Sequence, residues 1–173
     1  MPTPAPAPGS GFGRWTGPWI ARGESVAFEG DSERPFIGFT RRGIARYYPE
    51  DGSERRPSKE TWNAIWGRWD ILREGVNLGL APTSRKPRTI MAVNRSGNRL
   101  LLLVIAGGKP GYSLGTGLGD AASIAQAFGA WNAMACDEGG SSAMYLEKDD
   151  GIVSHLPGTG ERPVYSHFGI SSR

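Results

Sequence analysis

The first part of the chain is divided into short apolar runs. The runs PWIARGESVAFE (18–29) and PFIGFTRRGIARYY (35–48) are rich in aromatic and β-branched residues. Each is interrupted by an Arg-Gly pair, Arg22-Gly23 in the first and Arg42-Gly43 in the second, a composition typical of turns. The pattern therefore predicts short strands joined by tight turns.

Residues 58–75 (SKETWNAIWGRWDILREG) show helical spacing instead. Three tryptophans, Trp62, Trp66 and Trp69, stand at positions i, i+4 and i+7, and Ser58 has the composition of an N-cap. We therefore predict a helix over at least part of this segment. Because Gly67 interrupts it, a strand over 66–72 is the alternative. The tryptophans fit core packing, and stacking on sugars is the other interpretation.

The second half alternates more regularly. Residues 88–93 and 99–106 predict a hairpin around Ser96-Gly97-Asn98, and the apolar run 100–106 predicts a central strand that is covered on both faces. Residues 119–130 predict a helix ending at Gly129. Further strands are predicted at 131–136, on both sides of an Asp150-Gly151 turn (141–147 and 151–156), and at 162–171.

These elements predict an α+β fold. It would contain a mixed, mostly antiparallel sheet with one main helix packed on it, and a strand-rich N-terminal part. No internal repeat is visible in the sequence.

Composition limits the classes of function. The 173 residues are 38% hydrophobic, with 26 glycines and 13 prolines, which suits one domain of strands and loops. The net charge of +3 does not require nucleic acid, and no apolar run is long enough for membrane insertion. Cys136 is the only cysteine, so no disulfide forms within the chain.

The segment 1–13 is rich in proline and glycine and has neither the basic nor the apolar region of a signal peptide. We expect it to be a linker or tail through which an assembly partner could attach, and 14–173 to be a single domain. The localisation stays open, with virion association or export by another route as candidates.

Two familiar chemistries are disfavoured by spacing. GTGLGD (115–120), followed by Asp137, resembles a dinucleotide fingerprint, but a loop separates the glycines from the preceding strand. The chain has two histidines, His155 and His167, which are too few for a zinc site. We therefore expect no cofactor and no metal.

Two glycine loops, CDEGGSS (136–142) and GTGERP (158–163), carry the strongest chemical signal. An arginine fork grips phosphate oxygens, glycines let backbone N–H groups approach an anion, and serines add further donors. A carboxylate beside such groups can act at a sugar carbon. These parts fit a bond between a sugar and a phosphate. Tight turns with a structural Arg salt bridge are the alternative.

The segment 88–170 resembles the phosphodiester glycosidase family, which has bacterial and phage members. Its motifs are an Arg-Thr pair opening a strand, an Asp-Gly-Gly-Gly-Ser-Ser loop and a Glu-Arg-Pro-Val ending. The matching positions here are Arg88, Thr89, Asp137, Gly139, Gly140, Ser141, Ser142, Glu161, Arg162, Pro163 and Val164.

The resemblance implies a hydrolase of α-glycosyl phosphodiesters of the N-acetylglucosamine type, acting on a cell-surface or wall glycan. Arg88 and Arg162 would clamp the phosphate, and Asp137 would act at the anomeric carbon. The implied catalytic residues are Asp137, Arg162, Arg88 and Glu161, and the implied substrate-binding residues are Thr89, Glu138, Gly139, Gly140, Ser141 and Ser142.

The chain departs from the family pattern at two informative places. Glu138 stands where the loop normally has a glycine, and Gly107 stands where an aspartate is expected after a strand. Since neighbouring strand residues point to opposite faces, Asp137 and Glu138 share a site only if the chain turns between them. The second interpretation is therefore a catalytically degenerate member that serves as a glycan-binding or virion-type structural module.

Overall fold

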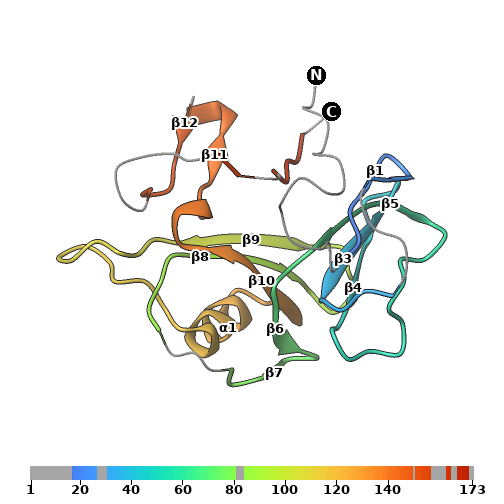
Figure 1. Ribbon diagram of the computed structural model, residues 1–173, viewed down its shortest axis with the longest axis horizontal. Helices are drawn as coiled ribbons and strands as arrows, with labels where there is room; N and C mark the ends of the chain where they lie inside the picture. Colours follow the sequence, from blue (N-terminus) through green and yellow to red (C-terminus); the bar gives the residue numbers. More distant parts are fainter. Residues whose placement is uncertain are drawn as a thin grey trace, which may run out of the picture.

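The computed structural model describes residues 17–26, 31–80, 84–149, 151–156, 163–164 and 167–171, which form two five-stranded sheets, a helix and a small hairpin (Figure 1). The first sheet contains β1 (Ile20–Ala21), β2 (Glu24–Ser25), β3 (Phe36–Thr40), β4 (Ala45–Tyr48) and β5 (Thr61–Trp66). The second contains β6 (Trp69–Arg73), β7 (Val76–Asn77), β8 (Arg88–Val93), β9 (Leu100–Ile105) and β10 (Asn132–Glu138). The remaining elements are α1 (Leu118–Ala127), the 3₁₀ turns η1 (Gly139–Ser141) and η2 (Glu147–Asp149), and the pair β11 (Tyr145–Leu146) and β12 (Gly151–Ile152).

The second sheet is the middle layer of the molecule. The small alanine side chains of α1 let the helix pack closely on one face, against Ile90 and Ala92 of β8. The opposite face contributes Met91 and Val93 to a second core that it shares with residues of the first sheet. Figure 1 shows α1 on one side of this sheet and the β11–β12 hairpin on the other.

The α+β class is confirmed, in a strand-rich form with one helix packed on a sheet. Every strand pair in the described part of the chain is antiparallel, so the parallel component of the expected mixed sheet is not found there.

The two large sheets repeat one topology, which the sequence had not revealed. Their strand orders are β2-β1-β5-β3-β4 and β7-β6-β10-β8-β9, so adding five to each strand of the first sheet gives the second. In each, two hairpins flank a central strand that comes last in the sequence.

The repeat includes the turn of the first hairpin in each sheet. This turn packs on a Trp-Asn pair, which is Trp62-Asn63 in the first sheet and Trp131-Asn132 in the second. Gly23 N donates to Trp62 O (2.7 Å) and Gly75 N donates to Trp131 O (2.8 Å). A Cβ built on either glycine would lie 2.8 Å from the ring of its tryptophan, and both have positive φ, so glycine is required at both turns. Trp62 and Trp131 are therefore structural parts of these turns, and of the three tryptophans in 58–75 it is Trp69 that packs against a core cluster.

Two further contacts are repeated: that of the residue before each of these glycines, and that of an arginine over each tryptophan ring. Arg22 N donates to Asn63 Oδ1 (3.0 Å) and Glu74 N donates to Asn132 Oδ1 (2.9 Å). The guanidinium of Arg41 lies 3.7 Å from the centroid of the Trp62 ring, and that of Arg95 lies 4.8 Å from the centroid of Trp131. These matching contacts align Trp62 with Trp131 and so set a common register for the two sheets.

The helix predicted within 58–75 is wrong, because this segment forms β5 and β6; the alternative, a strand over 66–72, corresponds to β6 at Trp69–Arg73. Trp62 and Trp66 are four residues apart, which places them on one face of a strand as well as of a helix. Trp69 lies beyond Gly67, on the next strand. A Cβ at Gly67 would lie 2.8 Å from the Met134 side chain, so the glycine lets the chain turn closely past β10 as it passes between sheets.

The hairpin of β8 and β9, the helix end at Gly129 (φ 86°) and the first two hairpins are confirmed. The central position of β9 is wrong. It is an edge strand, whose apolar run reflects cores on both faces, with Leu101 and Leu103 on one and Leu100 and Leu102 on the other.

The last strand, predicted at 162–171, is not formed by the described residues of that range, 163–164 and 167–171. Phe168 instead packs against the core between the sheets. The β11–β12 hairpin is present, and Asp150 of its predicted turn lies outside the described residues, as does the whole of the expected tail 1–13.

Candidate functional site

The candidate residues that the structure describes lie at, or directly after, the end where the second sheet extends beyond the first. In the common register, Phe36 pairs with Trp66 in the first sheet as Ile90 pairs with Ala135 in the second. The strands β3 and β5 end at that pair, whereas β8 and β10 continue. We call this continuation, Arg88–Thr89 of β8 and 136–138 of β10, the extended end.

A β-bulge sets the geometry of the extended end. Between the pairs Ala135↔Ile90 and Glu138↔Arg88, β10 uses one residue more than β8. The extra residue reverses the alternation of side chains, so Glu138 lies directly opposite Arg88. A carboxylate and a guanidinium from different strands are thereby brought together.

The Arg88 side chain is 1% exposed and is held entirely by protein atoms. Its guanidinium forms an ion pair with Glu138 Oε2, while its Nε donates to Thr116 O (3.1 Å) and its second amino group donates to Ser84 O (3.0 Å). Lys86 Nζ contacts the other oxygen of Glu138 at 2.6 Å. Two cations therefore share one carboxylate, whose side chain is 14% exposed.

Two hydroxyl groups of the predicted site are buried without a hydrogen-bond partner among the described residues: Thr89 Oγ1 and Ser142 Oγ. Ser142 is 1% exposed. A buried polar atom left unpaired costs about 1–3 kcal/mol, and a ligand or a water would relieve that cost. Both atoms are enclosed by protein, so a ligand can bond to them only after the chain around them moves.

The turn after β10 is built on glycine. Gly139 has φ 67° and its N–H donates to Pro87 O (3.1 Å), which joins the turn to the residue before β8. Gly139, Gly140 and Ser141 form η1, and Ser142 N then donates to Gly139 O (3.1 Å). The predicted glycine-serine loop is therefore a compact turn at the start of β8.

Asp137 is exposed at the bulge, next to the thiol of Cys136. Burial, with a further contribution from the Asp137 charge, raises the pKa of the Cys136 thiol to about 12. The thiol is therefore protonated at neutral pH, and Asp137 is the carboxylate of this region that faces solvent.

The position of the expected aspartate, Gly107, is closely packed. A Cβ there would lie 2.7 Å from Gly115 Cα and from Pro87 N. The loop between β9 and α1 thus lies against the residues before β8, and a side chain at 107 would require the backbone to move. At the position where the aspartate was expected, the loop is therefore tightly packed and leaves no space for a side chain.

Some predicted residues are brought together and others are separated. Arg88 and Thr89 alternate along β8, so they point to opposite faces, Arg88 toward Thr116 before α1 and Thr89 away from the helix. Glu161 and Arg162 lie outside the described residues. The roles given to all these residues remain predictions.

Sequence reasoning missed Lys86. The signal was available: Lys86 stands two residues before Arg88, and side chains two apart share a face of an extended chain. The bulge that brings Glu138 to this face left no comparable trace in the sequence.

Neither a metal cluster nor a membrane span is found within the described ranges. No three His, Cys, Asp or Glu side chains gather there as ligands of a metal ion. The ten-residue α1 is too short to cross a bilayer, and no longer helix is described.

Comparisons with known proteins agree with this fold. A family model described as "Phosphodiester glycosidase" matches residues 9–171. The structure of the zebrafish N-acetylglucosamine-1-phosphodiester alpha-N-acetylglucosaminidase catalytic domain, auto-inhibited by its pro-peptide, is similar with a TM-score of 0.62 and 20% identity. The similarity covers 81% of this chain and 50% of that one, so the chain spans about half the length of this relative.

A hypothetical protein from Synechocystis matches with a TM-score of 0.45 and 18% identity, over 80% of this chain and 30% of that one. Among curated proteins no match was found.

Proposed function

The chain belongs to the phosphodiester glycosidase family, and from that membership we propose that it hydrolyses an α-glycosyl phosphodiester of the N-acetylglucosamine type in a cell-surface or wall glycan. The observation that carries the proposal is the pair of buried hydroxyls, Thr89 Oγ1 and Ser142 Oγ, which lack a partner among the described residues and belong to two of the three motifs of the family. A substrate rich in phosphate and sugar oxygens supplies the missing hydrogen bonds.

In the proposed reaction a water oxygen forms a bond to the anomeric carbon. The bond from that carbon to the phosphate oxygen breaks, and its electron pair leaves with the phosphate. Asp137, exposed beside the η1 turn, accepts the proton of the water. Because a phosphate is a good leaving group, strong general-acid assistance is not required.

Ser142 and Thr89 position the phosphodiester in this proposal. Their hydroxyls are fixed by buried backbone, so they lose little freedom when the substrate binds. Arg162 is proposed as a phosphate clamp. Arg88 acts more indirectly, because its guanidinium is already engaged by Glu138, Thr116 and Ser84.

The test is release of sugar from an α-N-acetylglucosaminyl phosphodiester. We expect Asp137→Asn to lower kcat by about 100-fold or more, the typical contribution of a general base. Ser142→Ala should raise KM, since it removes one bond to the substrate. Asp149→Asn changes an exposed carboxylate on η2 and should leave kcat unchanged. Absence of sugar release by the unaltered protein, or equal rates in Asp137→Asn, contradicts the proposal.

One observation favours the second candidate, a degenerate member that serves as a glycan-binding or virion-type structural module. Glu138 forms ion pairs with both Lys86 and Arg88, so each cation already has a carboxylate partner where a phosphate would bind, although the three groups together keep one positive charge. Binding of a sugar phosphate with no release of sugar would support this candidate and exclude the enzyme.

A further inference from the structure

We propose that Tyr112, His155 and Lys109 form a saccharide-binding subsite beside the candidate site, which takes a pyranose ring that carries a phosphate group. The class of ligand rests on the proposed function. The subsite itself rests on the geometry of two surface segments that meet there.

The first segment is the 107–116 loop between β9 and α1. Its root is fixed to the chain before β8, where Lys86 and Thr116 exchange backbone hydrogen bonds (3.1 and 3.3 Å). Its tip is closed in the same way, because Lys109 and Ser113 exchange bonds of 2.8 and 2.9 Å. Ser113 Oγ also donates to Ala106 O (2.6 Å). The loop is consequently well ordered by its own hydrogen bonds.

This ordered loop presents an aromatic ring to solvent. Tyr112, at the tip, is 61% exposed, and its N–H is bonded to Lys109 O (3.1 Å). Packing of Tyr112 into the core therefore does not explain why the loop is ordered, since most of this residue is exposed. Exposed aromatic rings that are fixed in place are typical of binding surfaces.

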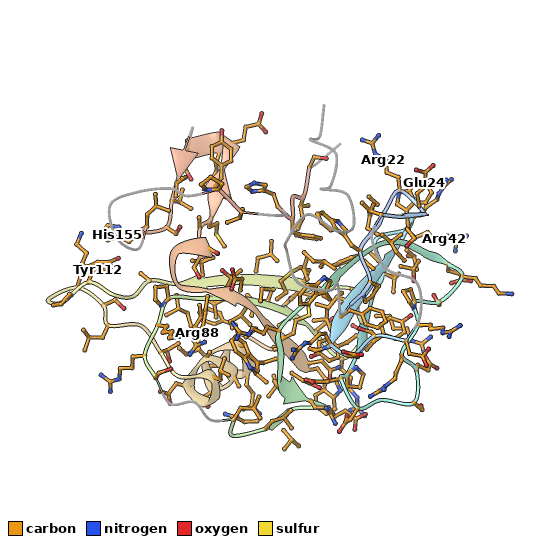
Figure 2. The ribbon with its side chains drawn as sticks, viewed as in Figure 1. Arg22, Glu24, Arg42, Arg88, Tyr112 and His155 are labelled. Carbon is orange, nitrogen blue, oxygen red and sulfur yellow. The ribbon has the colours of Figure 1, made fainter. Side chains whose placement is uncertain are left out.

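The second segment follows β12 and supplies His155. Its ring stacks on Tyr112 with centroids 4.2 Å apart and an interplanar angle of 29°. Figure 2 shows the two side chains next to each other at the tip of the 107–116 loop. Residues 43 positions apart thus build one aromatic surface.

A cation completes the surface. Lys109 Nζ lies 5.8 Å from the centroid of the Tyr112 ring, and Lys109 has no ion-pair partner among the residues described. Aromatic rings pack against the C–H face of a pyranose, and an ammonium group binds phosphate oxygens. A phosphorylated sugar combines both features.

The subsite adjoins the candidate site through the backbone. The 107–116 loop packs on Pro87 at Gly107, and Pro87 O accepts a hydrogen bond from Gly139 N of the η1 turn. His155 follows the hairpin that begins after Ser142. The loop of the subsite is therefore attached beside the strand that begins with Arg88, and its second segment follows the loop that ends at Ser142.

The test is binding of N-acetylglucosamine 1-phosphate by calorimetry or NMR titration. Tyr112→Ala should weaken binding at least about tenfold, and Tyr112→Phe, which keeps the ring, should stay within about threefold of the unaltered protein. Lys109→Gln should weaken binding of the sugar phosphate but not of N-acetylglucosamine alone. Phe128→Ala removes a ring that is 63% exposed at the far end of α1, and should change nothing.

The proposal is overturned if the unaltered protein does not bind the sugar phosphate, or if Tyr112→Ala binds it equally well. It is also overturned if Tyr112→Phe loses as much as Tyr112→Ala. Because this probe is a monoester that needs no turnover, binding without hydrolysis of the diester retains the subsite and rejects the enzyme. If the protein hydrolyses the diester and Tyr112→Ala hydrolyses it at the same rate, the enzyme is retained and the subsite is rejected.

Discussion

The two large sheets share a strand order and a docked turn, but they end differently. At the end of the first sheet, Phe36 stacks on Tyr48 with centroids 4.2 Å apart, and both are buried. At the corresponding end of the second, β8 and β10 continue into the extended end with Arg88, Thr89 and Glu138. The polar residues Arg88, Thr89 and Glu138 thus lie on the parts of β8 and β10 that continue beyond the pair at which β3 and β5 end.

The comparison indicates that one strand order can build both a sheet without candidate residues and a sheet that carries the candidate site. The shared part is stabilised by apolar packing and by the docked turns. The added part contains a buried ion pair and the hydroxyl of Thr89, which has no partner among the described residues, and such groups contribute little to stability or reduce it. Variants that act on the shared and the added parts separately can test this division.

The largest effect is expected at Glu138. Glu138→Ala leaves the buried Arg88 without its carboxylate, and we expect a loss of about 3 kcal/mol in the free energy of unfolding, measured in urea. The double variant Arg88→Leu with Glu138→Leu should recover most of that loss, because it makes this end apolar like that of the first sheet.

The exposed pair Arg46–Glu54 of the first sheet is the control, with side chains 56% and 57% exposed. Glu54→Ala should cost less than about 1 kcal/mol, as is usual for surface pairs. If Glu138→Ala costs no more than Glu54→Ala, the ion pair does not hold the extended end.

A smaller effect tests the equivalence of the docked turns. Gly23→Ala and Gly75→Ala each place a Cβ at positive φ and against a tryptophan ring, and each should lower the free energy of unfolding by about 2 kcal/mol. Gly43→Ala also has positive φ (79°), but its Cβ would meet nothing within 4 Å, so about 1 kcal/mol is expected. Unequal losses at Gly23 and Gly75 would contradict the repeat.

The elements that the sequence predicted correctly are those with local signals. The hairpins of the first sheet, the β8–β9 hairpin and α1 follow from turn residues, alternation and the alanine-rich run. The error at 58–75 arose because tryptophans four residues apart fit a helix and a strand equally well. Only the pairing of β5 with β3 and β1, which is not local, selects the strand.

The candidate site was predictable in its residue types and not in its geometry. The Asp-Glu-Gly-Gly-Ser-Ser run located the turn after β10, but the bulge depends on the register between β8 and β10. The burial of Arg88 and the packing of Gly107 on Pro87 likewise depend on segments that are distant in the chain. The stacking of Tyr112 on His155 had no signal in the sequence.

The smallest effect concerns Cys136, which the extended end contributes and the first sheet lacks. Its thiol has a pKa of about 12 in the folded state and an ordinary value of 9.0. Because the unfolded chain loses this proton first, the thiol stabilises the fold below pH 9, and that contribution is lost as pH rises toward 12. At pH 10 the loss should be about 1 kcal/mol relative to pH 8.

The measurement compares the pH dependence of unfolding with that of Cys136→Ser, in which this component should be absent. At pH 8 the native thiol should also react with iodoacetamide more slowly than the unfolded one, because a smaller fraction of it is thiolate. Equal rates in the native and unfolded protein would show that the thiol is not protected.

The strand order also has a consequence for synthesis on the ribosome. All five strands of the first sheet have been synthesised once residue 66 has been made. Ile20 of β1 pairs with Ala64 of β5, which is made 44 residues later. In the second sheet β8 and β9 pair locally, but β6 cannot meet its central neighbour until β10 is made, after α1. Sequence separation of this kind slows pairing, so the N-terminal sheet can serve as a surface on which the later sheet forms. Asp137 then belongs to β10, the last strand of the two large sheets to be made.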